Sequence, residues 1–115
     1  MSTAMQVRES GLADVEVLAA LHADCFEDCW SAQSMIEVIS SPGVCAWISV
    51  VTPAGSNDLV PVGFAIARVA ADEAELLSIG VSAPFRRHGV ASALLDEVIH
   101  RAAARGARRL FLEVA

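Results

Sequence analysis

Cysteine, aromatic side chains and positive charge are all scarce in this 115-residue sequence. Its three cysteines, Cys25, Cys29 and Cys45, are too few and odd in number for the disulfide framework of a small secreted domain, so we expect reduced thiols. The longest charge-free stretch, residues 38–57, is interrupted by serine, proline and glycine and cannot form a membrane-spanning helix. The N-terminus lacks the basic patch and apolar segment of a signal peptide. These absences predict a cytoplasmic protein without a membrane span.

Apolar residues are abundant, at 55% of the chain against 19% charged residues, which predicts one globular domain spanning residues 1–115. The net charge of −6 argues against general binding to nucleic acid or to an anionic membrane. Trp30 and Trp47 have no basic residues interleaved with them, so we expect them to pack in the core.

Positive charge is concentrated in one segment. Residues 1–85 hold only Arg8 and Arg68 against eleven carboxylates, whereas residues 86–109 hold six arginines against two carboxylates. A solvated helix face is the simplest explanation for four of these arginines. They are Arg101, Arg105, Arg108 and Arg109.

Hydrophobic periodicity and turn residues predict an α/β domain. Strands are expected over residues 5–9, 44–52, 60–69, 74–81 and 109–115, and helices over 12–25, from 32 to about 41, and from 90 to Gly106. Ser31 is expected to cap the second helix, and Gly106 to end the third. The apolar stripe of the third helix is Val90, Leu94, Leu95, Val98, Ile99 and Ala102.

The connection between the last two strands sets the predicted topology. The three central strands form an antiparallel meander, and the third of them leads through a helix into strand 109–115. A strand–helix–strand connection of this kind is right-handed and makes the two strands parallel. The sequence therefore predicts a mixed sheet.

The segment from Leu76 to Ala93, LLSIGVSAPFRRHGVASA, carries the chemistry. A buried strand enters a short loop, which turns directly into a helix whose first turn is made of small residues. Free N–H groups at such a helix N-terminus bind anions. Arg86, Arg87 and His88 add side-chain charge there, so we expect a phosphate-binding site. It is neither a Walker A loop nor a GxGxxG dinucleotide motif.

The strand LSIGV followed by R-x-x-G-x-A, with Arg86, Gly89 and Ala91, resembles the acetyl-CoA-binding motif of the GCN5-related N-acetyltransferase (GNAT) superfamily. Other segments resemble its RimI-type branch, the ribosomal-protein alanine N-acetyltransferases, in order and at similar spacing. They are CWS at 29–31, DEA at 72–74, SIGV at 78–81 and LFLEV at 110–114. The resemblance runs from about Arg8 to the last residue.

The resemblance implies the acyl-CoA N-acyltransferase fold, in which strands 74–81 and 109–115 splay apart around the pantetheine arm of acetyl-CoA. The pyrophosphate would lie on the amides around residues 87–91, and no metal is implied. The expected cofactor-binding residues are Ile79, Gly80, Val81, Arg86, Arg87, His88, Gly89, Val90, Ala91 and Ser92.

The reaction implied is attack of a neutral amine on a thioester, with a carboxylate accepting the proton. Glu113 matches the catalytic glutamate of the RimI pattern, and Glu75 lies near the position that other branches use; we prefer Glu113. The acceptor implied is a protein N-terminal α-amine, with a ribosomal protein as candidate partner and a homodimer as candidate assembly. An acidic body suits such a cationic acceptor.

The chain departs from the family pattern at its end. Ala115 falls inside the predicted fifth strand, whereas family members continue through another helix and two strands, including a tyrosine that protonates the CoA thiolate; this sequence has no tyrosine. We expect an incomplete domain, either truncated or completed by another chain. The alternative function is a non-catalytic acyl-CoA-binding or interaction module.

A zinc site formed by His22, Cys25 and Cys29 is the other chemistry that residue spacing suggests. No fourth ligand is evident, and Cys25 lies on the apolar stripe of the first helix, so core thiols are the preferred interpretation.

Overall fold

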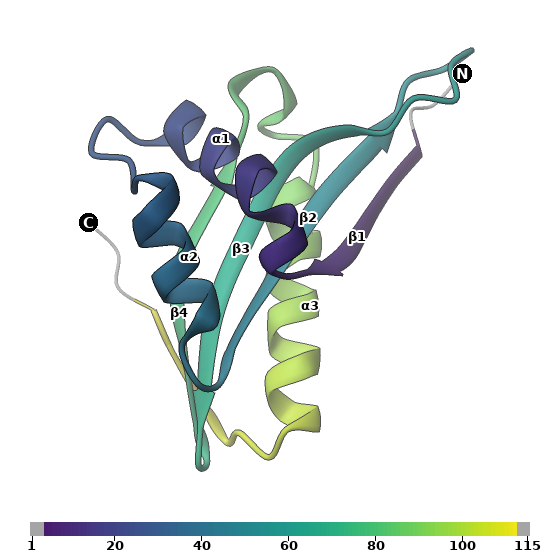
Figure 1. Cartoon of the computed structure of the whole chain (residues 1–115). Coiled ribbons are helices and arrows are strands. Elements are labelled where there is room, and N and C mark those ends of the chain that lie inside the picture. The colour runs from purple at the N-terminus through teal and green to yellow at the C-terminus, as the bar shows by residue number, and fades with distance from the viewer. Residues whose placement is uncertain (1–3, 113–115) are drawn as a thin grey trace.

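The computed structural model describes residues 4–112, which form one mixed sheet flanked by helices (Figure 1). The elements in chain order are β1 (Ala4–Ser10), η1 (Leu12–Asp14), α1 (Val15–Cys25), α2 (Ala32–Ser40), β2 (Val44–Thr52), β3 (Val60–Ala70), β4 (Glu73–Val81), η2 (Ala83–Phe85), α3 (Val90–Ala104) and β5 (Arg109–Leu112). The strand order follows the sequence, β1 to β4 are antiparallel, and β5 runs parallel to β4. The predicted mixed sheet, meander and crossover are confirmed.

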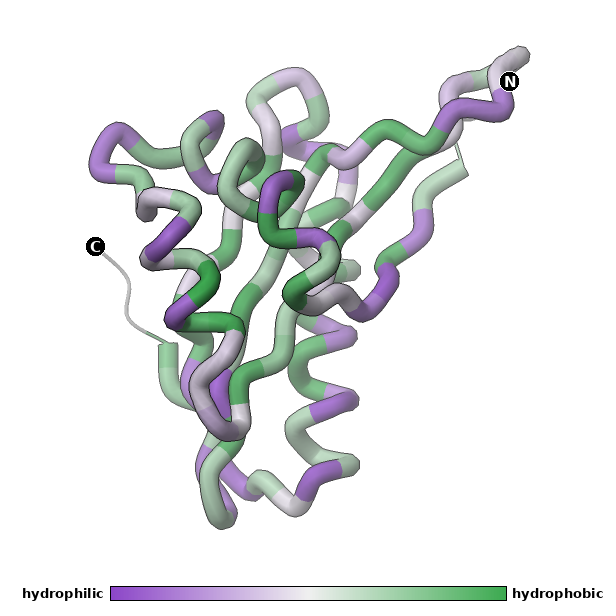
Figure 2. The backbone as a smooth tube through the Cα atoms, viewed as in Figure 1, coloured by the Kyte–Doolittle hydropathy of each residue, from purple (hydrophilic) through white to green (hydrophobic). Residues whose placement is uncertain are grey.

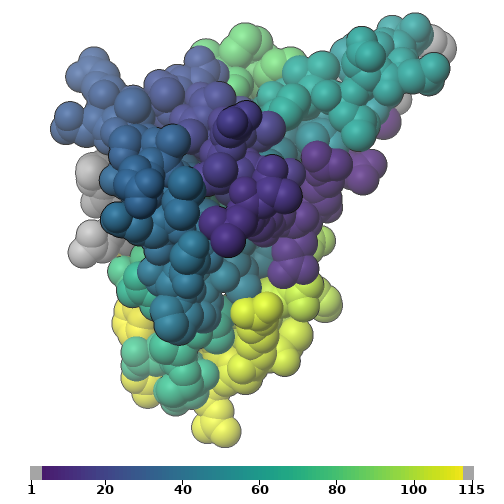
Figure 3. Space-filling model, viewed as in Figure 1, coloured from purple at the N-terminus to yellow at the C-terminus, as the bar shows by residue number. Residues whose placement is uncertain are grey.

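The two faces of the sheet are covered by different helices. Alternate side chains of a strand point to opposite faces, so the neighbours Trp47 and Ile48 enter different clusters. Trp47, with Leu94, belongs to the cluster beneath α3, whereas Ile48, with Leu18, belongs to the cluster beneath α1 and α2. Figure 2 shows hydrophobic residues following the central strands, and Figure 3 shows α1 and α2 covering one face.

Helix α3 buries a narrower stripe than its sequence predicted. Val90, Leu94, Val98 and Ala102 are buried at intervals of four, but Ile99 is 49% exposed. Ile99 follows Val90 by nine residues, which at about 100° per residue places it on the opposite side of the helix. The prediction that Ile99 packs in the core is therefore wrong.

The predicted helix ends are confirmed. Ser31 accepts a hydrogen bond at Oγ from the backbone N–H of Ser34 at 3.0 Å and so caps α2. Gly106 follows α3 with φ of +93°, and Ala107 donates its N–H to the carbonyl of Ala102 at 2.9 Å.

A β-bulge in β4 positions the functional segment. Ile66 pairs with Ser78 and Ala67 with Leu76, so Leu77 has no partner in β3. On the other side of β4, the described ladder with β5 runs from Glu73 to Leu76 and ends at Leu112. The predicted last strand is described only as far as Leu112.

None of the helices within residues 4–112 is both long and apolar enough to cross a bilayer. The three cysteines are free thiols: Cys45 is buried, Cys25 half-buried and Cys29 exposed.

Candidate functional site

The turn between β4 and α3 is built from two residues in the left-handed region. Ser82 donates its N–H to the carbonyl of Val62 at 2.8 Å, which fixes the end of β4 beside β3. After η2, Arg87 has φ of +66° and Gly89 has φ of +79°. Glycine adopts this conformation readily, and at Gly89 it lets the chain turn sharply into α3.

The N-terminus of α3 presents a group of free donors. Ala93 donates its N–H to Gly89 at 3.0 Å, as the first internal bond of the helix requires. Within the part of the chain that the structure describes, the backbone N–H groups of residues 87–92 have no acceptor. Such a group of donors, together with the helix dipole, attracts an anion. The phosphate-binding site predicted from the sequence has this geometry.

Arg86 and Arg87 behave differently although they are adjacent. The Nε–H of Arg86 donates to the carbonyl oxygen of Val81 at 2.9 Å. The side chains of Arg86, Arg87 and His88 are all exposed, but those of Arg87 and His88 make no hydrogen bond within the described residues. Arg86 therefore reaches back to the end of β4, whereas Arg87 and His88, which neighbour the free N–H groups in the chain, are not engaged by other described side chains.

Beyond the bulge, β4 is paired on one side. Residues 78–81 pair with β3, and no other described strand lies along their second edge. Ile79 packs against the cluster beneath α3. Gly80 faces the opposite way: a Cβ added there would lie 2.8 Å from Sγ of Cys25 and 2.8 Å from Cε1 of Phe64. The absence of a side chain at Gly80 therefore allows α1 to approach the sheet.

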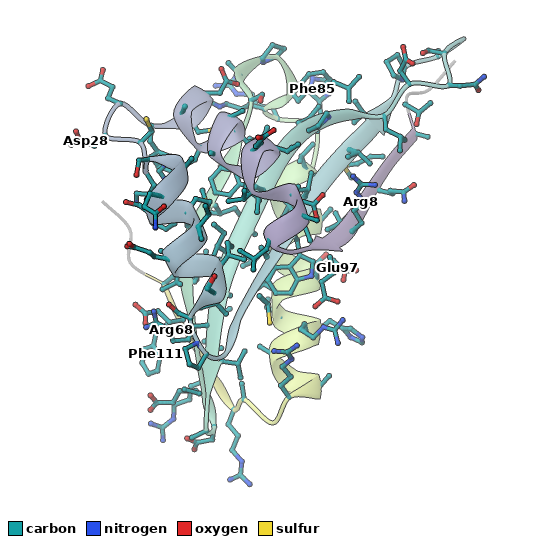
Figure 4. All side chains as sticks on the ribbon, viewed as in Figure 1. Arg8, Asp28, Arg68, Phe85, Glu97 and Phe111 are labelled. Carbon is teal, nitrogen blue, oxygen red and sulfur yellow. The ribbon has the colours of Figure 1, made fainter. Side chains whose placement is uncertain are left out.

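Glu75 lies on the face of the sheet covered by α1 and α2. It is exposed, and its partners in the register, Arg68 on β3 and Phe111 on β5, point to the same face. Figure 4 shows Arg68 and Phe111 close together near the lower end of α2. These residues line a cavity of about 380 Å³ together with Glu73 and Leu112. Glu113, the preferred catalytic residue, lies outside the described residues.

His22 forms an aromatic cluster that the sequence analysis missed. Its side chain is 3% exposed and stacks on Trp30 at a centroid distance of 4.6 Å, with Phe26 at 4.7 Å. Its Nδ1 accepts a hydrogen bond from the backbone N–H of Trp30 at 3.1 Å. The spacing of His22, Phe26 and Trp30 at intervals of four residues is the sequence feature from which this cluster could have been predicted.

No metal centre appears around His22. Because Nδ1 accepts the Trp30 N–H, this atom is not free to bind a metal ion. Among residues 4–112, no group of three or more histidine, cysteine, aspartate or glutamate side chains could hold one.

The His22 cluster predicts a pH-dependent stability. Burial lowers the pKa of His22, and its Nδ1 can accept a hydrogen bond only while unprotonated. The unfolded chain therefore binds the proton more readily, so stability is complete above about pH 6.5 and falls as the pH drops below it. We expect urea unfolding at about pH 7.5 and about pH 5 to show a smaller loss for His22→Asn than for wild type.

Asparagine can still accept the Trp30 N–H, so His22→Asn removes the titration while keeping an acceptor. The exposed His100→Gln is the matched control and should keep the wild-type pH dependence. An equal pH dependence in His22→Asn and wild type would contradict the prediction.

The fold and site define a class: α/β proteins in which a bulged strand of a mixed sheet leads into a helix N-terminus with a row of free N–H groups. Residues 15–115 match the model of the acetyltransferase (GNAT) family, and the chain belongs to that family. The family predicted from R-x-x-G-x-A and its surroundings is thus confirmed.

Solved structures have the same fold. The ribosomal-protein-S18-alanine N-acetyltransferase from Escherichia coli is 24% identical, with a TM-score of 0.80 over 96% of this chain and 67% of that chain. The aminoglycoside N-acetyltransferase AAC(6')-Iy in complex with CoA is 20% identical, with a TM-score of 0.81 over 100% of this chain and 80% of that chain. NAA60 from Arabidopsis thaliana is 22% identical, with a TM-score of 0.78 over 96% and 75%. No curated protein matches the chain.

Proposed function

We propose that the chain, as one domain over residues 1–115, transfers an acetyl group from acetyl-CoA to an amine. The observation that carries this proposal is the row of free N–H groups at residues 87–92, next to the strand edge that follows the bulge. An anionic ligand with an extended arm fits this arrangement, because phosphates suit the N–H groups and an amide-containing arm suits a strand edge. Membership of the acetyltransferase (GNAT) family supports the same ligand.

The ligand would be held by backbone groups more than by side chains. The N–H groups from Arg87 to Ser92 would bind the pyrophosphate, with charge from Arg87 and His88. The pantetheine arm would lie along the second edge of residues 78–81. Ile79 would contribute its backbone groups, because Gly80 is hydrogen-bonded in register with Phe64 of β3 and the carbonyl of Val81 already accepts from Arg86.

The proposed reaction is an acyl transfer. The amine nitrogen attacks the thioester carbonyl carbon; the new N–C bond forms, the C–S bond breaks and CoA leaves as a thiolate. One proton must leave the amine, and a carboxylate accepts it directly or through water. Glu113 is the proposed base, with Glu75 as the alternative because it lines the cavity on the α1 and α2 face.

A protein N-terminal α-amine is the proposed acceptor. The pKa of an α-amine, about 8, makes its deprotonation easier than that of a lysine side chain. Residues 9–67 contain eight carboxylates and neither lysine nor arginine, so this part of the chain suits a cationic acceptor. The similar structure from Escherichia coli is that of a ribosomal-protein-S18-alanine N-acetyltransferase, which supports a ribosomal protein as the partner. AAC(6')-Iy is an aminoglycoside acetyltransferase, so a cationic small molecule is the second candidate.

The first test is thermal unfolding of the 115-residue chain with and without acetyl-CoA. A ligand at about 100 times its Kd adds about 2.7 kcal/mol to the free energy of unfolding, so we expect a clear upward shift in Tm. Peptide acetylation measured by CoA release should then fall in Glu113→Gln, with the Tm shift retained. Glu75→Gln is the matched variant and should keep turnover if Glu113 is the base.

A cooperatively folded chain whose Tm does not respond to acetyl-CoA would contradict the proposal. A normal Tm shift without CoA release for any amine acceptor would instead favour a non-catalytic acyl-CoA-binding module.

A further inference from the structure

Arg86 closes the turn after β4 with two hydrogen bonds. Its backbone N–H donates to the carbonyl of Ala83 at 3.3 Å, and its Nε–H donates to the carbonyl of Val81 at 2.9 Å. The side chain thus folds back over η2 and supplies a donor for the last carbonyl of β4. Without this donor the Val81 carbonyl would lose its only partner among the described side chains.

The same guanidinium lies beside Cys25 at the end of α1. Burial raises the pKa of the Cys25 thiol and the charge of Asp24 adds to this, whereas the nearby positive charge of Arg86 opposes it. Sγ of Cys25 in turn fills the space over Gly80. Through its two hydrogen bonds Arg86 therefore joins the end of β4 to the turn that leads into α3.

Arg87 has no such contacts. Its side chain is exposed, as that of Arg86 is, but it makes no hydrogen bond or ion pair within residues 4–112. Its φ of +66° turns the chain toward the free N–H groups of α3. Charge that is not engaged elsewhere is available to a phosphate. The two adjacent arginines are thus suited to different tasks.

We propose that Arg86 is a positioning residue, whose N–H donor fixes the carbonyl end of β4 in the turn before α3, and that Arg87 supplies the side-chain charge for the phosphates. This role rests on the proposed acetyl-CoA site. It predicts that affinity depends on the donor at position 86 and on the charge at position 87.

Three substitutions separate donor from charge at position 86. Gln places a neutral N–H donor the same number of bonds from Cα as Nε of arginine, Met places a methyl group there, and Lys keeps the charge but moves its donor one bond further. Binding of CoA itself, measured by calorimetry, is the readout. We expect Arg86→Met to raise the Kd about tenfold, Arg86→Gln to stay within about threefold of wild type, and Arg86→Lys to fall between them.

Arg87→Gln is the matched control on the neighbouring residue. It should weaken CoA binding at low salt and reduce the salt dependence of the Kd, because an exposed charge is screened. Arg86→Gln should keep the wild-type salt dependence. The proposal would be overturned if Arg86→Lys kept the wild-type affinity while Arg86→Gln lost it and also reduced the salt dependence of the Kd. Arg86 would then be a phosphate ligand.

Amide hydrogen exchange without CoA tests the positioning role of Arg86 separately from the proposed function. Arg86→Met should speed exchange of the amide of Ser82, which is bonded to Val62 at the end of β4, and of the amide of Phe85, which is bonded to Ser82 in the turn; Arg87→Met should not. Unchanged exchange in Arg86→Met overturns the positioning role. If the wild-type protein fails to bind CoA, the proposed acetyl-CoA site is overturned. The exchange result then remains the test of whether Arg86 positions the end of β4.

Discussion

Replacing Gly89 with valine is expected to abolish measurable CoA binding while leaving the chain folded. Gly89 has φ of +79°, and a β-branched residue is a clear outlier in this region. The strain, about 1–2 kcal/mol, is relieved when the turn changes shape, and the N–H groups of residues 87–92 then no longer converge. Calorimetric titration with CoA should show no binding under conditions in which wild type is saturated.

Gly55 offers a matched control for this experiment. It lies in the turn between β2 and β3 with φ of +80°, and a Cβ added at Gly55 or at Gly89 meets no atom within 4 Å. Gly55→Val therefore imposes the same backbone strain away from the proposed site. We expect it to lower Tm by a similar amount and to bind CoA as wild type does. Equal loss of binding in both variants would show that strain alone is responsible.

Replacing Trp47 with alanine is expected to cause the largest loss of stability. Trp47 is 2% exposed, in the middle of β2, and belongs to the cluster beneath α3. Truncating a buried tryptophan costs about 3–5 kcal/mol, a large fraction of the about 5–15 kcal/mol that stabilises a domain. Urea unfolding should show a midpoint far below that of wild type.

Ile99→Ala on α3 is the control for Trp47→Ala. Ile99 is 49% exposed and points away from the sheet, so its truncation should change the free energy of unfolding by less than about 0.5 kcal/mol. A small effect at Trp47, or a large one at Ile99, would contradict the observed packing of β2 and α3.

Local patterns in the sequence determined the elements of this fold. The cap at Ser31, the glycine after α3 and the β-branched, apolar runs of the central strands depend on neighbours within a few residues, so they can be predicted without the fold. The parallel placement of β5 followed from the handedness of strand–helix–strand connections. The segment at residues 86–92, which we propose binds phosphate, could be found in the sequence because its candidate donors are consecutive in the chain.

The tertiary structure alone decided which side chains meet across elements. The bulge at Leu77 depends on the register between β3 and β4, and the stacking of His22 depends on how the chain folds back after α1. The sequence indicates Arg86 as a phosphate ligand because its charge and its place before the helix can be read directly. Its hydrogen bond to the carbonyl of Val81 depends on the shape of the turn, which the sequence does not reveal. Sequence periodicity specifies which face of an element is buried, but contacts between elements depend on packing distances and register, which no local pattern contains.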